Sequence, residues 1–111
     1  MASPVDMIVL FNAQTTDANS TVANLSYPNG KACVKAFGTW NGATVALQVA
    51  APTSVATGVW IPLKDVNGNL VSFTANGVAF IENMVYDDQI RAVQSSSGGS
   101  TTVSCTLQPS N

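Results

Sequence analysis

Residues 43–49 read Ala-Thr-Val-Ala-Leu-Gln-Val, a run in which large aliphatic side chains occupy every second position from Val45 to Val49. The positions between them are small or polar. Because successive side chains of a β-strand point to opposite faces, this run predicts a strand with one apolar face and one polar face. The same two-residue period recurs at Val59, Ile61 and Leu63. It also recurs near the end of the chain, in Thr101–Gln108.

Working outward from this run, the chain is rich in Val, Ile, Thr and Phe and nearly without helical periodicity. Only Ala13–Ala23 and Glu82–Asp88 are expected to hold a helical turn. The sequence therefore predicts an all-β domain, an antiparallel β-sandwich that is jelly-roll-like or a partly closed barrel, with about seven to nine strands. Its strands are expected at Val5–Phe11, Thr21–Ser26, Lys31–Phe37, Ala43–Val49, Gly58–Leu63, Asn69–Ala75, Gly77–Ile81, Gln89–Gln94 and Thr101–Gln108.

Turn residues separate these segments. Four Asn-Gly pairs, which tolerate positive φ at both positions, favour tight turns. Asp65–Asn69 predicts a hairpin, and Asn41-Gly42 is expected to join its two flanking strands in the same way. Ser95–Ser100 predicts a flexible hairpin loop, and Ala50–Thr57, which contains Pro52, predicts another loop. The whole chain, residues 1–111, is interpreted as one domain with a short N-terminal arm of about five residues.

The composition argues against several classes of function. The 111-residue chain has no histidine, so the commonest general base and metal ligand is missing, and we expect no enzyme and no catalytic residues. Its four basic residues form no stripe for phosphates, and it has no apolar run long enough for a transmembrane helix, so neither nucleic acid nor membrane is an expected partner. Asp65, Asn67 and Asn69 match the start of a calcium loop, but the later glycine and glutamate are missing, so we expect no metal and no cofactor.

Low charge instead indicates surfaces covered by other proteins. Only 9% of the residues are charged, whereas about 25% is usual, and the formal net charge is −2. Copies with so little charge repel one another weakly. A neutral secreted β domain would have the same composition, although the first residues do not resemble a secretion signal, and synthesis in a cytoplasm is expected.

Three further expectations concern single side chains. Cys33 and Cys105 are expected to be free and mostly buried thiols, with Cys105 facing inward and Cys33 outward. Arg91, alone in an apolar strand, is expected to pair with Asp87 or Glu82 in a structural role, and a contact to a partner is the alternative. Trp60, opposite Val59 and Ile61 in the alternation, is expected to be partly exposed or in a subunit contact.

Candidate interface residues follow from the arm, the loop and the aromatic side chains, because such groups anchor protein contacts. A glycan stacked on an aromatic ring is the competing interpretation. The candidates are Ala2, Ser3, Pro4, Trp40, Pro52, Val55, Trp60 and Tyr86.

One stretch resembles a known family. Residues 38–48, Gly-Thr-Trp-Asn-Gly-Ala-Thr-Val-Ala-Leu-Gln, resemble the Gly-x-aromatic-x-Gly-Ala-Thr-Val-x-Leu-Gln strand-turn-strand of small β-sandwich virion proteins of tailed bacteriophages. Gly58–Leu63, Gln89–Val93 and Ser100–Leu107 resemble later strands of that family in the same order, so the resemblance extends from Val5 to Leu107. In this chain Ala50–Thr57 stands where the family has an Asp-Gly turn.

The resemblance implies a structural component of a bacteriophage particle, assembled in the host cytoplasm and carried on the virion. A capsid cement or decoration protein, bound to the major capsid protein or other virion proteins and forming a homo-oligomer, most readily a trimer, is the first hypothesis. A glycan- or receptor-binding module of a tail or fibre, and a tail or neck structural subunit, are the alternatives. The motifs belong to the scaffold, so they transfer no catalytic residues.

Overall fold

The computed structural model describes residues 7–25, 30–52, 54–82 and 88–109. Ten strands and no helix occupy these residues, which confirms the predicted all-β sandwich. No helix in the described part of the chain could therefore cross a membrane. The strands are β1 (Ile8–Gln14), β2 (Ala18–Asn19), β3 (Ala23–Leu25), β4 (Ala32–Thr39), β5 (Thr44–Ala50), β6 (Trp60–Pro62), β7 (Ser72–Phe73), β8 (Gly77–Ile81), β9 (Asp88–Ser95) and β10 (Thr102–Pro109).

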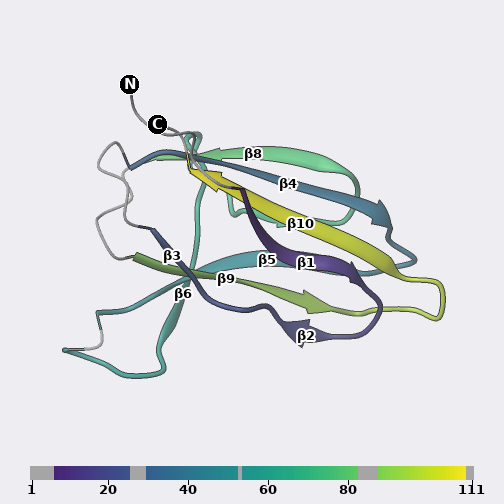
Figure 1. The fold of residues 1–111 in the computed structure, drawn as a ribbon, viewed down its shortest axis with the longest axis horizontal. Coiled ribbons are helices and arrows are strands. Elements are labelled where there is room, and N and C mark those ends of the chain that lie inside the picture. Colours follow the sequence, from purple (N-terminus) through teal and green to yellow (C-terminus); the bar gives the residue numbers. More distant parts are fainter. Residues whose placement is uncertain (1–6, 26–29, 53, 83–87, 110–111) are drawn as a thin grey trace.

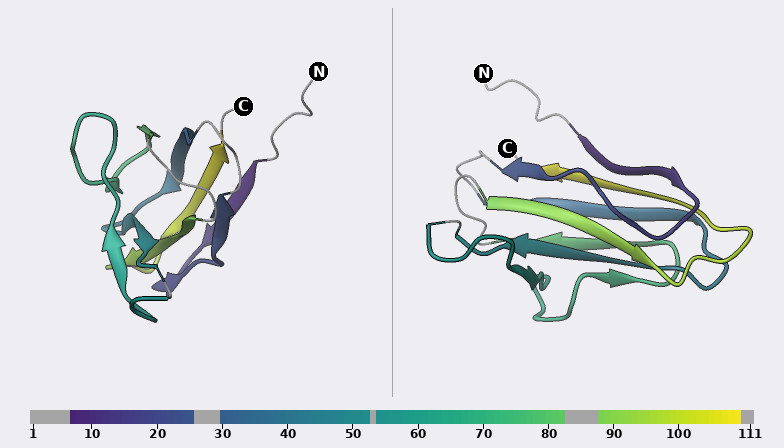
Figure 2. Two further views of the ribbon diagram at one scale, coloured as in Figure 1. Left: turned by 90° about the vertical axis from the view of Figure 1, so that its left-hand side faces the viewer. Right: turned by 90° about the horizontal axis from the view of Figure 1, so that it is seen from below.

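The strands form two antiparallel sheets that face each other (Figure 1). Sheet A has the order β1-β10-β4-β8, and sheet B has the order β2-β9-β5-β6, with β3 also paired to β9 and β7 also paired to β5. Seen from other directions, the two sheets diverge where β6 leaves the body of the molecule (Figure 2). The architecture is that of a β-sandwich.

The pairing is nested, as in a long antiparallel ribbon that has been rolled up. β1 pairs with β10, β2 and β3 pair with β9, β4 pairs with β8, and β5 pairs with β6 and β7. Successive pairs of this ribbon alternate between sheet A and sheet B. If β2–β3 and β6–β7 are each counted as one interrupted strand, the result is the eight-stranded winding of a jelly roll.

Four connections cross between the sheets at the same end of the sandwich, which we call the crossover end. They are residues 15–17, 40–43, 74–76 and 96–101 (Figure 1). Asn76 ties two of them together, because its Oδ1 accepts hydrogen bonds from Gly38 N and Trp40 Nε1, both at 2.9 Å. A third connection, residues 96–101, is bound to the 40–43 turn, because the Thr101 hydroxyl donates a hydrogen bond to Trp40 O at 2.9 Å.

Two turn predictions are therefore corrected. Asn41 and Gly42 do form a tight turn with positive φ, closed by Ala43 N donating to Trp40 O at 2.8 Å. The turn joins β4 of sheet A to β5 of sheet B, so it is a crossover and not a hairpin. Ser95–Ser100 likewise joins sheet B to sheet A and is tied down, with Ser97 N donating to Asp17 Oδ1 at 2.9 Å. Hydrogen bonds from the backbone and the side chain of Ser97 lower the pKa of the Asp17 carboxyl below its ordinary value of 3.8.

The Asp65–Asn69 hairpin is confirmed. Asp65 N donates to Asn69 O at 2.8 Å, and Asp65 Oδ1 accepts from the backbone N–H groups of Asn67 and Asn69. The carboxylate is thus used in an Asx-type turn. The prediction of a helical turn in Ala13–Ala23 is wrong, because this segment contains β2 and the start of β3; that of Glu82–Asp88 falls mostly outside the described residues.

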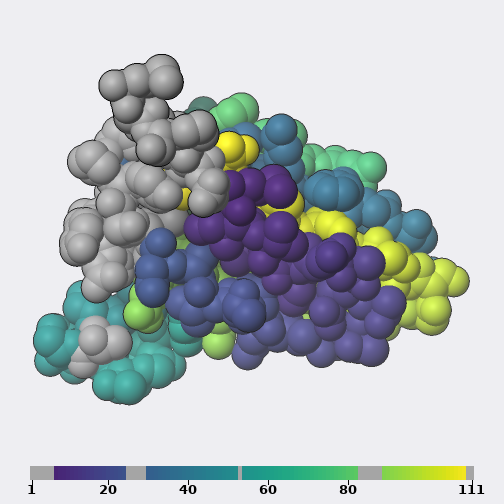
Figure 3. Space-filling view, viewed as in Figure 1, coloured from purple at the N-terminus to yellow at the C-terminus, as the bar shows by residue number. Residues whose placement is uncertain are grey.

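Both edges of sheet A are protected against further strand addition. At the β8 edge of sheet A, the tip of the Asp65–Asn69 hairpin reaches over, and Val66 N donates to Phe80 O at 2.9 Å. At the β1 edge, the register with β10 shifts twice, and Ala13 has a positive φ of 53°. Bulges and covering loops are the usual ways to blunt an edge. The segment from β1 to β3 lies on the side of the molecule seen in Figure 3, with β1 at the edge of sheet A and β2 and β3 paired to β9 in sheet B.

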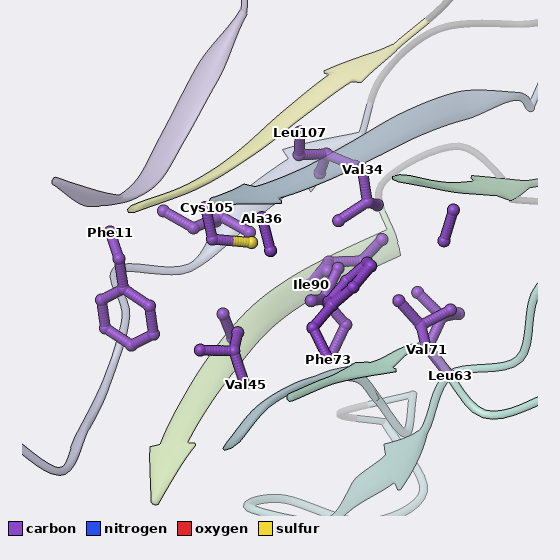
Figure 4. Close-up of a cluster of buried hydrophobic side chains, with 14 of the residues drawn as sticks. Phe11, Val34, Ala36, Val45, Leu63, Val71, Phe73, Ile90, Cys105 and Leu107 are labelled. Carbon is purple, nitrogen blue, oxygen red and sulfur yellow. The ribbon is translucent and has the colours of Figure 1, made fainter. Parts of the chain in front are cut away.

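The core lies between the sheets and is built from the alternate residues that the sequence indicated. Val45, Leu47, Val103, Cys105 and Leu107 are at most 1% exposed. Side chains from the two sheets meet in this layer (Figure 4). The prediction fails at one end, where Val59 and Ile61 are 47% and 48% exposed, because β6 turns away from the sandwich and sheet A does not cover them.

Candidate protein-binding faces

The outer face of sheet A carries a group of exposed apolar side chains. Phe37 on β4 is 48% exposed, and Val78 and Phe80 on β8 are 53% and 58% exposed. The register places Phe80 opposite Cys33 and Val78 opposite Lys35 on the neighbouring strand. These five residues are called the sheet A patch.

The surroundings of the patch are polar but uncharged. On β10, Ser104, Thr106 and Gln108 lie opposite Phe37, Lys35 and Cys33. Among the outward-facing strand residues of sheet A that the structure describes, Lys35 is the only charged one. Aromatic and aliphatic side chains with little charge around them are typical of the centre of a protein interface.

The outer face of sheet B has a different character. Arg91 on β9 donates from Nε to Gln48 Oε1 on β5 at 2.9 Å, and its Cζ lies 4.2 Å from the centroid of the Trp60 ring on β6. Trp60 is half-buried, in agreement with its expected partial exposure. The expected pairing of Arg91 with Glu82 is wrong, because Glu82 follows β8 on the other sheet; Asp87 lies outside the described residues.

The loop between β5 and β6 extends away from both sheets (Figure 1). Its base is closed by Ala51 N donating to Val59 O at 2.9 Å, and Pro52 O accepts from Val55 N and Ala56 N. Pro52 is exposed, and Val55 is 85% exposed, the highest value among the exposed large hydrophobic side chains that are described. These two interface candidates are therefore accessible.

The remaining interface candidates are less accessible or not described. Trp40 is half-buried, packs against the core, and donates its indole N–H to Asn76, so its ring helps to hold the crossover end. Ala2, Ser3, Pro4 and Tyr86 lie outside the described residues.

The two cysteines lie on opposite faces of sheet A, as predicted. Cys105 is fully buried in the core and Cys33 is partly buried beside Phe80, and both are free thiols, in agreement with the expectation. Their register partners differ, Gln108 for Cys33 and Ala36 for Cys105, so their side chains are not placed to form a disulfide.

Burial raises the pKa of the Cys105 thiol from 9.0 to about 12. We expect a thiol reagent at about pH 8 to label Cys33 in the folded protein and Cys105 only after unfolding. Between pH 9.0 and about 12 the unfolded thiol loses its proton while the folded thiol keeps it. The free energy of unfolding should then fall as pH rises, by at most about 1.4 kcal/mol per pH unit.

Urea unfolding of the native chain and of Cys105→Ala across this pH window measures the slope due to Cys105. The difference between the two chains should fall with rising pH. Equal labelling rates for the two thiols in the folded protein would contradict the buried position of Cys105.

The sequence did not single out Phe37, Val78 or Phe80 as contact residues. In Gly77–Ile81 the side chains of both faces are apolar, so alternation does not reveal which face is outward. A signal was available on β4, where Phe37 shares the side of Lys35, a residue that rarely faces a core.

Comparison with protein-family models, curated proteins and solved structures found no match to this chain.

Proposed function

We propose that this protein is a structural component of a bacteriophage particle, and that it acts as a capsid cement or decoration protein. It stabilises the shell by packing against the major capsid protein or other virion proteins. The resemblance of its strand-turn-strand motif to phage virion proteins supports the particle, and the sheet A patch supports the mode of action. The proposed state is a homotrimer carried on the virion.

The jelly-roll winding is compatible with this role but is not by itself evidence for it. Viral capsid domains, lectins and cupins all use double-sheet jelly rolls, so the function must be argued from the surface. With both edges of sheet A blunted, contacts of this sheet with other chains are left to its outer face and to the loops.

The observation that carries the proposal is the exposure of Phe37, Val78 and Phe80 on one face, where Lys35 is the only charged strand residue that the structure describes. Covering such side chains removes apolar surface from water, which stabilises the complex by roughly 25 cal/mol per Å² before the costs of association. A face of this domain together with its loops is large enough for a standard interface, about 800 Å² per partner. Many identical copies on a lattice then add their contributions through multivalent attachment.

The glycan-binding alternative finds less support in the described residues. Carbohydrate sites use an aromatic ring as a stacking platform, but Arg91 occupies one face of the Trp60 ring and Trp40 is packed against the core. A glycan array probed with the purified protein tests this alternative directly, and specific hits would favour it.

The main test replaces Phe37, Val78 and Phe80 by threonine, a polar β-branched residue that suits a strand. Each substitution should remove about 1 kcal/mol of binding free energy. Together the three should weaken binding to particles that lack the protein by roughly 100-fold. Binding is measured by co-sedimentation with such particles, and the heat resistance of the reconstituted particles is measured alongside.

A matched control replaces three other exposed apolar residues, Val59, Ile61 and Leu70, by threonine. This control should bind as the native chain does. The proposal fails if particles without the protein have unchanged heat and osmotic resistance, or if both triple variants bind equally well.

A further inference from the structure

We infer that Arg91, held by Gln48 and Trp60, binds a carboxylate of another protein on the outer face of sheet B. This gives the domain a second contact face, on the opposite side of the sandwich from the sheet A patch. The carboxylate site depends only on the local geometry, whereas the assignment of its carboxylate to a neighbouring virion protein rests on the proposed function.

Three strands fix the position of the guanidinium group. Gln48 on β5 lies directly opposite Arg91 on β9, and on its other side opposite Pro62 on β6. The hydrogen bond from Arg91 Nε to Gln48 Oε1, 2.9 Å, holds one edge of the guanidinium plane. The Trp60 ring, with its centroid 4.2 Å from Arg91 Cζ, holds one face. A long side chain that is otherwise mobile is thus oriented before any ligand arrives, which lowers the entropy cost of binding.

The donors that remain define the ligand. A guanidinium group has five N–H donors, and the bond to Gln48 uses the one on Nε. Its end-on pair of Nη groups matches the two oxygen atoms of a carboxylate, which they bind through two parallel hydrogen bonds. Because one monovalent cation faces the ligand, a monovalent carboxylate is the matching anion.

Among the residues that the structure describes, the strand neighbours of Arg91 on this face carry no opposite charge. The described outward-facing strand residues around Arg91 are all uncharged: Thr44, Ala46, Gln48, Ala50, Gln89, Val93, Trp60, Pro62 and Ser72. The described acidic side chains lie elsewhere, Asp17 at the crossover end, Asp65 in the hairpin and Glu82 after β8. A carboxylate from a partner would supply the missing charge at a half-buried position, where ion pairs are stronger than at an exposed one.

The direct test is an NMR titration of the isotopically labelled chain with sodium acetate, at constant ionic strength. The Arg91 Nε–H and Trp60 indole resonances should shift together and saturate. Arg91→Lys keeps the charge but loses the fork, and should weaken acetate binding at least tenfold. Gln48→Ala, which frees the Nε edge, should weaken it severalfold, and Lys35→Gln should leave it unchanged.

Three results would overturn the inference. One is an Arg91→Lys chain that binds acetate as well as the native chain does. Another is acetate binding that appears only after Asp87→Asn or Asp88→Asn, which would show that the chain's own carboxylates fill the fork. The last is preferential binding of inorganic phosphate, which would show that the anion class is wrong.

Particle binding tests the source of the carboxylate. Arg91→Lys should reduce co-sedimentation with particles that lack the protein, and the triple threonine variant of the sheet A patch should still bind acetate like the native chain. If Arg91→Lys has no effect on co-sedimentation, the carboxylate does not come from the particle. Failure of the patch experiment alone would reject the proposed function and leave the carboxylate site standing.

Discussion

Replacing Gly38 by alanine is expected to lower the free energy of unfolding by about 4 kcal/mol, enough to unfold much of a domain of ordinary stability. Gly38 has a φ of 139°, a conformation that L side chains rarely adopt. It lies opposite Val103 in the β4–β10 pair, and an added Cβ would collide with the backbone carbonyl oxygen of Thr102. Because the obstacle is the backbone of a central strand, neither partner can move without breaking the ladder.

Urea unfolding followed by circular dichroism measures this effect, and two other glycines serve as controls. Gly68→Ala also adds a side chain at positive φ, 82°, but into open space, so it should cost only about 1 kcal/mol. Gly99→Ala meets nothing within 4 Å, and should change stability by less than about 0.5 kcal/mol. A Gly38→Ala chain as stable as Gly68→Ala would contradict the close approach of β4 and β10.

Shortening Leu107 to alanine should have the second largest effect, a loss of about 3–4 kcal/mol. Leu107 is fully buried on β10, between Val34 on β4 and Ile8 on β1, and in the layer where the two sheets meet (Figure 4). Its removal leaves a cavity that both sheets border, and the surrounding backbone ladders prevent the cavity from collapsing.

Leu107→Met, which keeps most of the side-chain volume, should lower the free energy of unfolding by less than about 1.5 kcal/mol. This control distinguishes the effect of the cavity from the effect of changing the residue type. Val78→Ala, at a position that is 53% exposed, should be close to neutral. Equal midpoints for Leu107→Ala and Val78→Ala would show that Leu107 does not lie in the core.

The strands could be predicted from the sequence because most of them have one dry face. Val45, Leu47, Val103 and Leu107 are all buried on the side that alternation indicated. Alternation is a local property, however, and it does not say which sheet a strand joins. The turn at Asn41 and Gly42 has the positive φ values that the residue types suggested. It nevertheless connects a strand of one sheet to a strand of the other and does not form a hairpin. Sheet membership depends on pairings between residues far apart in the chain.

The candidate contact surfaces could be predicted only in part. Trp60, Pro52 and Val55 are accessible, as loop and aromatic residues often are. Val78 and Phe80 could not be assigned to the outside, because their neighbours Ala79 and Ile81 are apolar as well. The partners of Arg91 were also hidden, since Gln48 and Trp60 are distant in sequence and a stacked aromatic ring leaves no charge pattern to detect.

The hydrogen bond from Val66 N to Phe80 O, which occupies the β8 edge, has a consequence for how free copies of the protein meet. Each free copy exposes Phe37, Val78 and Phe80 on the outer face of sheet A. With the β8 edge occupied and the β1 edge distorted, chance encounters through these side chains cannot be extended into a shared backbone ladder. Encounters between copies through the outer face of sheet A are therefore expected to stay reversible and not to grow into fibres along this sheet.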